Sequence, residues 1–132
     1  MKIGIDALPL LGRAGGRSYL DSLLRHLIRQ DSENQYLFFF RTLRENLWPA
    51  RSFGQFSNVS LHRVLIPNRI LESLWTKRRV NLPFNREFFK NIDLYFSPTS
   101  FLPLIKKCAF VSVVYDLTVL KYPAYKLSLI HI

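Results

Sequence analysis

Five short hydrophobic runs divide the chain and predict five β-strands, at residues 2–6, 36–40, 59–64, 92–97 and 110–115. The run at 36–40 is uninterrupted (Tyr-Leu-Phe-Phe-Phe), which is typical of a strand buried on both faces of a parallel sheet. The run at 59–64 mixes apolar and polar positions, so we expect this strand to lie nearer an edge of the sheet.

Two stretches have the spacing of amphipathic helices. Between residues 19 and 28 the apolar positions recur at helical spacing, and polar side chains fill the other face. We expect this helix to follow Ser18, because Ser18 and Asp21, three positions on, approach a capping box. A second helical pattern occupies residues 70–79 and ends in three basic residues, which suits the negative end of a helix dipole. Residues 8–17 and 41–57 predict loops, the latter with a helical turn.

This order of strands and helices predicts an α/β fold, a Rossmann-like, mostly parallel sheet with helices on both faces. A length of 132 residues fits one domain. In open sheets of this kind, ligands bind outside the carboxyl ends of the strands. The rule indicates four places, which lie after Asp6, after Phe40, after Ser97 and at Tyr115-Asp116.

The loop at residues 8–17 lies where dinucleotide-binding proteins place their phosphate loop. It lacks the G-x-G-x-x-G pattern and exceeds the length of that tight turn, which argues against a dehydrogenase. Gly15 and Gly16 nevertheless precede a helix whose N-terminus can receive an anionic or hydroxylated ligand, and Arg17 can add a charge-assisted contact. An ordinary flexible connection is the alternative interpretation.

Two further groups of polar residues follow predicted strands. Tyr115 and Asp116 lie at the end of the last predicted strand, where a sheet of this type presents working groups, although Asp116 could instead cap a following helix. Ser97 and Thr99 belong to a hydroxyl-rich turn that ordinary turn chemistry would also explain.

Metal and disulfide chemistry find no support in the sequence. The three histidines have no partner at metal-ligand spacing, so we expect no metal site. Cys108 is the only cysteine, which excludes a disulfide framework within the chain and fits a reducing compartment.

The net charge is +10, from 19 Lys and Arg against 9 Asp and Glu. Such a charge favours polyanions: nucleic acid, an anionic membrane face or phosphorylated small molecules. A basic surface that is merely solvated explains it equally well. No nucleic-acid-binding motif is visible, so we expect no nucleic acid partner. Residues 1–6 do not resemble a signal peptide and no run approaches the roughly 18 apolar residues of a membrane span. We expect a cytoplasmic protein, with peripheral contact to the inner membrane left open.

Several segments combine into a more specific pattern. They are residues 1–10 (Met-Lys-Ile-Gly-Ile-Asp-Ala-Leu-Pro-Leu), 15–20 (Gly-Gly-Arg-Ser-Tyr-Leu), 93–98 with 101–103, and 113–118 with 121–123. In their order and spacing, they resemble the N-terminal part of family 4 (group 1) glycosyltransferases, over residues 1–126.

The resemblance implies a GT-B fold, in which two Rossmann-like domains face each other across a cleft. Residues 1–126 would form the N-terminal, acceptor-side domain, and the donor-binding C-terminal domain would be missing. The full enzyme would be a hexosyltransferase that moves a sugar, with retention, from a nucleotide sugar to a saccharide or lipid-linked acceptor. It would need no metal and no cofactor. Gly15, Gly16, Arg17, Ser97 and Thr99 would bind substrate.

The resemblance also implies a catalytic role for Tyr115 and Asp116. The family usually has His immediately before its Asp-Leu pair, and here Tyr115 occupies that position. A tyrosine can donate a hydrogen bond, but it does not shuttle a proton near neutral pH as histidine does.

The last six residues, Leu-Ser-Leu-Ile-His-Ile, break the resemblance and look like a translated sequencing adaptor. We therefore expect residues 127–132 to be a non-native tail and the fragment alone to be inactive. The alternative function is a non-catalytic Rossmann-like binding domain with a basic surface for nucleic acid or an anionic membrane.

Overall fold

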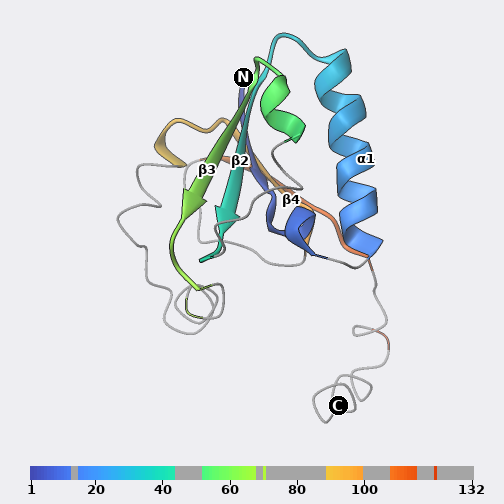
Figure 1. Cartoon of the computed structure of the whole chain (residues 1–132), viewed down its shortest axis with the longest axis vertical. Coiled ribbons are helices and arrows are strands. Elements are labelled where there is room, and N and C mark those ends of the chain that lie inside the picture. The colour runs from blue at the N-terminus through green and yellow to red at the C-terminus, as the bar shows by residue number, and fades with distance from the viewer. Residues whose placement is uncertain are drawn as a thin grey trace.

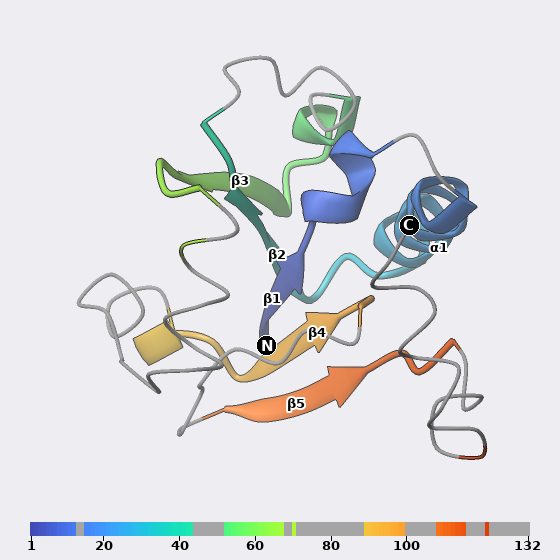
Figure 2. The same ribbon diagram turned by 90° about the horizontal axis from the view of Figure 1, so that it is seen from below.

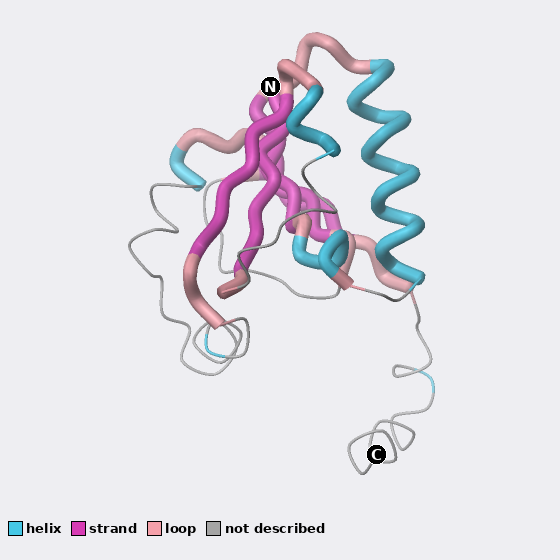
Figure 3. The backbone as a smooth tube through the Cα atoms, viewed as in Figure 1, coloured by secondary structure: helices cyan, strands magenta, loops and turns pink. Residues whose placement is uncertain are grey.

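The protein is built on a single parallel sheet, seen in a computed structural model that describes residues 1–12, 15–43, 52–67, 70, 89–99, 108–115 and 121. The sheet has five strands in the order β3-β2-β1-β4-β5, and every pairing between neighbours is parallel. The predicted α/β, Rossmann-like fold is confirmed (Figures 1 and 3). Its elements in chain order are β1 (Lys2–Asp6), the 3₁₀-helix η1 (Leu8–Leu11), α1 (Gly15–Gln30), β2 (Gln35–Arg41), the 3₁₀-helix η2 (Ser52–Gln55), β3 (Val59–Val64), β4 (Leu94–Ser97) and β5 (Ala109–Ser112).

One face of the sheet packs against α1. Leu20, Leu24 and Ile28 recur every four residues along the helix and are buried, so they form its core-facing stripe. They share one hydrophobic cluster with residues of β1, η1, β2 and η2, among them Ile5, Leu10, Tyr36, Phe38, Phe40 and Phe53. Figure 1 shows α1 running alongside the strands. Tyr36, Phe38 and Phe40 alternate along β2 and are the residues of this strand that belong to the cluster on the side of α1.

The opposite face of the sheet carries a second cluster. Phe39 of β2, Tyr95 of β4 and the preceding Phe89 and Ile92 are buried together there. The Phe89 ring lies 5.1 Å from that of Tyr95 and 6.2 Å from that of Phe39. Phe89 is helical, so helical residues lie on both faces of the sheet, as predicted.

Gly4, at the centre of β1, lets this second cluster approach the sheet closely. A Cβ atom at Gly4 would lie 2.7 Å from Cδ1 of Ile92 and 3.0 Å from Cδ2 of Tyr95. Real Cβ atoms essentially never come within 3.0 Å of another heavy atom, so even alanine requires these side chains to move. The close packing at this point therefore depends on glycine.

The helix begins earlier than the sequence pattern indicates. The structure starts α1 at Gly15, so the prediction that Ser18 caps the helix is wrong, and Asp21 instead forms an ion pair with Arg25 at 2.7 Å. Part of the predicted loop before it is also helical, since η1 occupies Leu8–Leu11. The physical reason is burial: Leu10 is fully enclosed by the core, and Pro9 fits the first turn of a helix.

The strand predictions hold with changed ends. The strands β1 and β3 have the predicted bounds, and β3 is an edge strand, as expected. The predicted strand at 110–115 is too long, because β5 ends at Ser112. Its neighbour β4 ends at Ser97, and the backbone N–H of Val113 donates to the Ser97 carbonyl as the last bond of this ladder (3.1 Å). The second predicted helix, at 70–79, lies outside the described residues except for Ile70.

The turn between α1 and β2 is organised by the carboxylate of Asp31. One oxygen accepts the backbone N–H groups of Glu33 (3.0 Å) and Asn34 (3.1 Å), and the other accepts the Asn34 side-chain amide (2.6 Å) and the Tyr36 hydroxyl (2.5 Å). These donors, with the Tyr36 hydroxyl first, lower the pKa of Asp31 to about 2. Burial and the same hydrogen bond raise the pKa of Tyr36.

We predict that Gly4→Ala destabilises the protein by about 1–3 kcal/mol, because the added methyl group overpacks the cluster around Ile92 and Tyr95. Urea denaturation of the variant and the parent measures the difference. Gly54→Ala is the matched control, since a Cβ at Gly54 meets nothing within 4 Å. We expect a change of less than about 0.5 kcal/mol there, and equal effects at the two positions would contradict the packing argument.

A second prediction concerns pH. The Asp31 pKa is about 2 in the folded protein and 3.8 without these contacts, so its stabilisation is fully present above about pH 4 and disappears as the pH falls towards 2. Asp31→Asn should therefore be less stable than the parent at pH 6, and the gap should narrow at pH 2.5. Urea denaturation at both pH values measures the gap. Glu33→Gln controls for the loss of a nearby exposed charge, and a gap that is the same at both pH values would refute the assignment.

Candidate functional site

The carboxyl ends of the strands define the candidate site. From β1 the chain moves outward through β2 to β3 and then returns to the other side of β1 for β4 and β5. The neighbours β1 and β4 therefore flank the point at which the strand order reverses. Open α/β sheets bind ligands in the crevice outside the carboxyl ends of the strands at this point. Figure 2, which views the sheet from below, shows β4 and β5 on one side of β1, with β2 and β3 on the other.

The N-terminus of α1 lies at this end of the sheet. Gly15, Gly16 and Arg17 are the first three residues of the helix, and in Figure 1 the helix starts at the end to which the strand arrows point. The first N–H groups of a helix have no partner within the helix, and the dipole makes this end positive. A Cβ at Gly16 would meet nothing within 4 Å, so the space beside this residue is open.

Tyr115 lies against α1 through a contact with Tyr19. The two rings are 6.0 Å apart between centroids and nearly perpendicular, at 83°. Tyr19 is the fifth residue of α1, one turn after Gly15. The contact therefore brings the segment after β5 to the start of α1. Both rings also remain accessible, with 44% of Tyr19 and 56% of Tyr115 exposed.

The phenol of Tyr115 stays protonated at neutral pH. Burial, and secondarily the neighbouring Tyr19, raise the pKa of Tyr115 above its ordinary value. A neutral phenol donates one hydrogen bond and accepts others. Asp116, the second residue predicted to be catalytic, lies outside the described residues.

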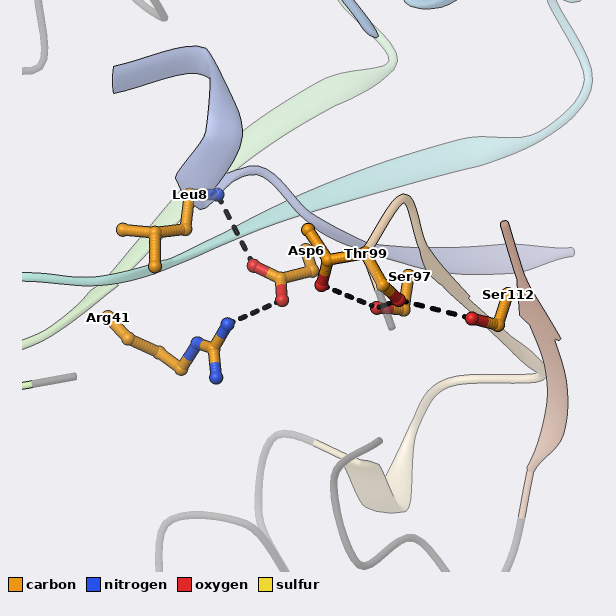
Figure 4. A network of polar contacts seen from close by, with 6 residues as sticks. All are labelled: Asp6, Leu8, Arg41, Ser97, Thr99 and Ser112. Atoms are coloured by element: carbon orange, nitrogen blue, oxygen red, sulfur yellow. Dashed lines mark hydrogen bonds and ion pairs between the residues drawn. The ribbon is translucent and has the colours of Figure 1, made fainter. Parts of the chain in front are cut away.

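Ser97 is the last residue of β4, Thr99 lies in the turn that follows, and both take part in a hydrogen-bonded cluster (Figure 4). The hydroxyl of the fully buried Ser97 donates to the Thr99 carbonyl at 3.0 Å and lies 3.3 Å from the Thr99 hydroxyl. The Ser112 hydroxyl at the end of β5 donates to the same carbonyl at 3.1 Å. These bonds hold the ends of β4 and β5 together. Tyr115 follows Ser112 by three residues, so its Cα lies within roughly 11 Å of that of Ser112.

A buried ion pair, which the sequence analysis does not predict, joins the ends of β1 and β2. Asp6 ends β1 and Arg41 ends β2, and Nη2 of Arg41 donates to Oδ2 of Asp6 at 2.5 Å. The side chains are 0% and 2% exposed. The other oxygen of Asp6 accepts the backbone N–H of Leu8 at 3.3 Å, which links the pair to the start of η1 (Figure 4). The sequence contains a signal for this pair, because an acidic residue ends β1 and a basic residue ends β2, which is its parallel neighbour.

The ion pair lies on the same face of the sheet as Tyr95. Burial raises the pKa of Tyr95 well above its ordinary value, and the Asp6 carboxylate adds to the effect. Ile5 pairs with Phe96 in the register of β1 and β4, so Asp6 and Ser97 occupy the next positions of these strands. The ion pair and the hydroxyl cluster are therefore neighbours at the carboxyl edge of the sheet.

Within the part of the chain that the structure describes, no group of three or more His, Cys, Asp and Glu residues could hold a metal ion. Charge at this edge comes instead from the helix terminus and from the Asp6–Arg41 pair. Across the same described residues, no helix combines the length and the apolar character needed to cross a membrane.

No family model, no curated protein and no solved structure matches this chain. Its placement among known proteins therefore depends on the residues themselves and on the geometry of the sheet edge.

We predict that breaking the buried ion pair from either side is costly. Asp6→Asn leaves a buried guanidinium without its counter-charge, and Arg41→Gln leaves the carboxylate, so each should destabilise by about 3–5 kcal/mol. The double variant should lose clearly less than the sum of the two, because neither charge then remains. A double-mutant cycle by urea denaturation measures this coupling. Additive losses would show that the two side chains stabilise the fold independently.

Proposed function

We propose that this chain is the acceptor-side domain of a GT-B glycosyltransferase, which transfers a sugar from a nucleotide sugar to a saccharide or lipid-linked acceptor with retention. The observation that carries the proposal is the contact between Tyr19 and Tyr115. It joins the segment after β5 to Tyr19, one turn after the start of α1. Tyr19 and Tyr115 belong to two of the segments on which the resemblance to family 4 glycosyltransferases depends, and their contact supports the proposal.

In this proposal the N-terminus of α1 faces the phosphates of the donor. Gly15 and Gly16 have no side chains to block the approach of a ligand to the helix, and Arg17 adds a positive charge. The helix dipole and Arg17 would stabilise the negative charge that develops on the departing nucleotide. This electrostatic role would serve a reaction without a metal ion.

Tyr115 would position the transferred sugar through a neutral hydrogen bond. Its pKa is raised, so it remains a donor at physiological pH and does not act as a general base. The exposed rings of Tyr19 and Tyr115 would border the sugar on the side of α1. Ser97 and Thr99 would act mainly through the shape of the turn, because the Ser97 hydroxyl is used within the protein.

The alternative function, a non-catalytic domain with a basic surface, is favoured by the net charge of +10. Salt-dependent binding to DNA in a gel shift, or to vesicles of anionic lipid, would support it. Binding of this kind with no sugar transfer by any extended form of the protein would replace the enzymatic proposal.

The domain assignment predicts that the purified chain turns over no nucleotide sugar, because the donor would be held by a second domain. Sequencing the genomic DNA downstream of Lys126 tests whether such a second domain is encoded. A frame that continues into a second Rossmann-like domain supports the proposal. Turnover by the 132-residue chain alone, or a continuing frame that encodes an unrelated fold, contradicts it.

In the protein extended by such a domain, Tyr115→Phe should lower kcat/KM about fivefold. The variant keeps the ring contact with Tyr19 and loses one hydrogen bond, worth about 1 kcal/mol. Initial rates of transfer from a labelled nucleotide sugar measure the change. Val114→Ala, which alters the exposed neighbouring residue, should leave the rate within about twofold. Equal rates for the parent and Tyr115→Phe would remove the hydroxyl from the mechanism.

A further inference from the structure

The two edge strands of the sheet, β3 and β5, differ in the side chains that they carry. The strand β3 contains His62 and Arg63, and a charged side chain on an edge strand discourages pairing with another strand. The strand β5 (Ala-Phe-Val-Ser) contains neither a charged residue nor a proline. Figure 2 shows β5 as the outermost strand on its side of the sheet. Of the two edges, β5 is therefore the one better suited to accept a further strand.

Apolar side chains of β5 are exposed on both faces of the sheet. Val111 pairs with Phe96 of β4, which packs on the cluster that contains the residues of α1, and 45% of Val111 is exposed. On the opposite face Phe110 pairs with Tyr95, their ring centroids lie 6.1 Å apart, and 38% of Phe110 is exposed. Pairing with another strand would cover apolar surface on both faces.

The hydrogen bonds between β5 and β4 determine which backbone groups of β5 point to the open edge. The Val113 N–H donates to the Ser97 carbonyl at 3.1 Å, and the Ala109 N–H donates to the residue before β4 at 3.0 Å. Because alternate residues of a strand direct their N–H and C=O groups to the same neighbour, Phe110 and Ser112 direct theirs outward. Among the described residues, no hydrogen bond uses these outward groups.

A second copy of β5 offers the matching set of groups. When two β5 strands meet antiparallel around a two-fold axis at Val111, Phe110 of one copy lies opposite Ser112 of the other, and the reverse pair is equivalent. Both are hydrogen-bonded pairs, in which the two residues exchange both of their N–H···O=C bonds. This arrangement therefore satisfies the backbone groups that Phe110 and Ser112 direct outward.

The side chains of β5 are compatible with the same arrangement. The two Val111 side chains meet at the axis as a non-hydrogen-bonded pair, in which opposite Cα atoms lie about 4.5 Å apart. On the other face the two Phe110 rings are diagonal neighbours, at a separation that aromatic side chains span. Since β5 carries no charge, its pairing places no like charges opposite each other, although each chain has a net charge of +10.

We propose that this chain forms a two-fold symmetric dimer in solution through antiparallel pairing of β5, which joins the two sheets into one. The open backbone groups of Phe110 and Ser112, together with the exposed Val111, carry the proposal. It does not rest on the proposed function, because the same edge is present whether or not the domain takes part in sugar transfer.

Light scattering and amide hydrogen exchange of the 132-residue chain test the dimer. At high micromolar concentration the mass should approach twice the 15.6 kDa of a single chain, and it should fall on dilution. The amides of Phe110 and Ser112 should lose protection on dilution, whereas the Val113 amide, which donates to β4, should keep it. A dimer without protection of Phe110 and Ser112 overturns the proposal. So does a monomer at every concentration, which would leave the edge to a strand from a different protein.

Charges introduced at residue 111 test the position of the axis. Val111→Lys places two positive charges opposite each other and should weaken dimerisation about tenfold or more, and Val111→Glu should have the same effect. A mixture of the two variants should form a heterodimer, because opposite charges then meet at the axis. Leu61→Lys is the matched control, since Leu61 is 36% exposed on the other edge strand, and it should leave the dimer intact.

Equal weakening by Leu61→Lys and Val111→Lys would overturn the assignment of the interface to β5. Failure of the mixed variants to associate, when each gives a well-dispersed amide spectrum, would also overturn it. Hydrogen exchange of the parent chain decides the question if either variant fails to fold.

Discussion

The ion pair between Asp6 and Arg41 joins the carboxyl ends of the central strand and its neighbour inside the protein. Two buried charges are tolerated only when each compensates the other and hydrogen bonds satisfy their remaining lone pairs and N–H groups. Asp6 meets this condition through Arg41 on one oxygen and the Leu8 N–H group on the other. The pair thereby fixes where β1 stops, where η1 starts and how β2 ends. A cavity beside Arg41 and the hydroxyl cluster beside Asp6 both take their positions from it.

The edge of the sheet carries two different kinds of surface. On the side of β4 and β5, two accessible tyrosine rings meet the N-terminus of a helix, which favours negative charge. On the side of β2 and β3, the cavity, lined in part by Leu8, Leu11 and Leu43, lies beside the buried Arg41. Each side can be tested without the other.

The sequence predicted the layered sheet well and the local ends of its elements less well. The uninterrupted Tyr36–Phe40 run lies in β2, because a strand covered on both faces has no polar positions. The helix α1 begins three residues before Ser18, where the sequence pattern predicts its cap. Capping preferences favour Ser18, and the glycines at 15 and 16 disfavour a helix. Packing of η1 and α1 on the sheet outweighed those local preferences.

The sequence by itself determined the fold class, because the spacing of hydrophobic residues specifies strands, helices and their order before any contact forms. It also predicted ligand sites at four strand ends. Only the tertiary structure decided which of these ends meet. The contact of Tyr115 with Tyr19, the pairing of Asp6 with Arg41 and the cavity at Leu43 join residues that are far apart along the chain. Such contacts depend on the order of the strands within the sheet, which the spacing of hydrophobic residues along the chain does not by itself specify.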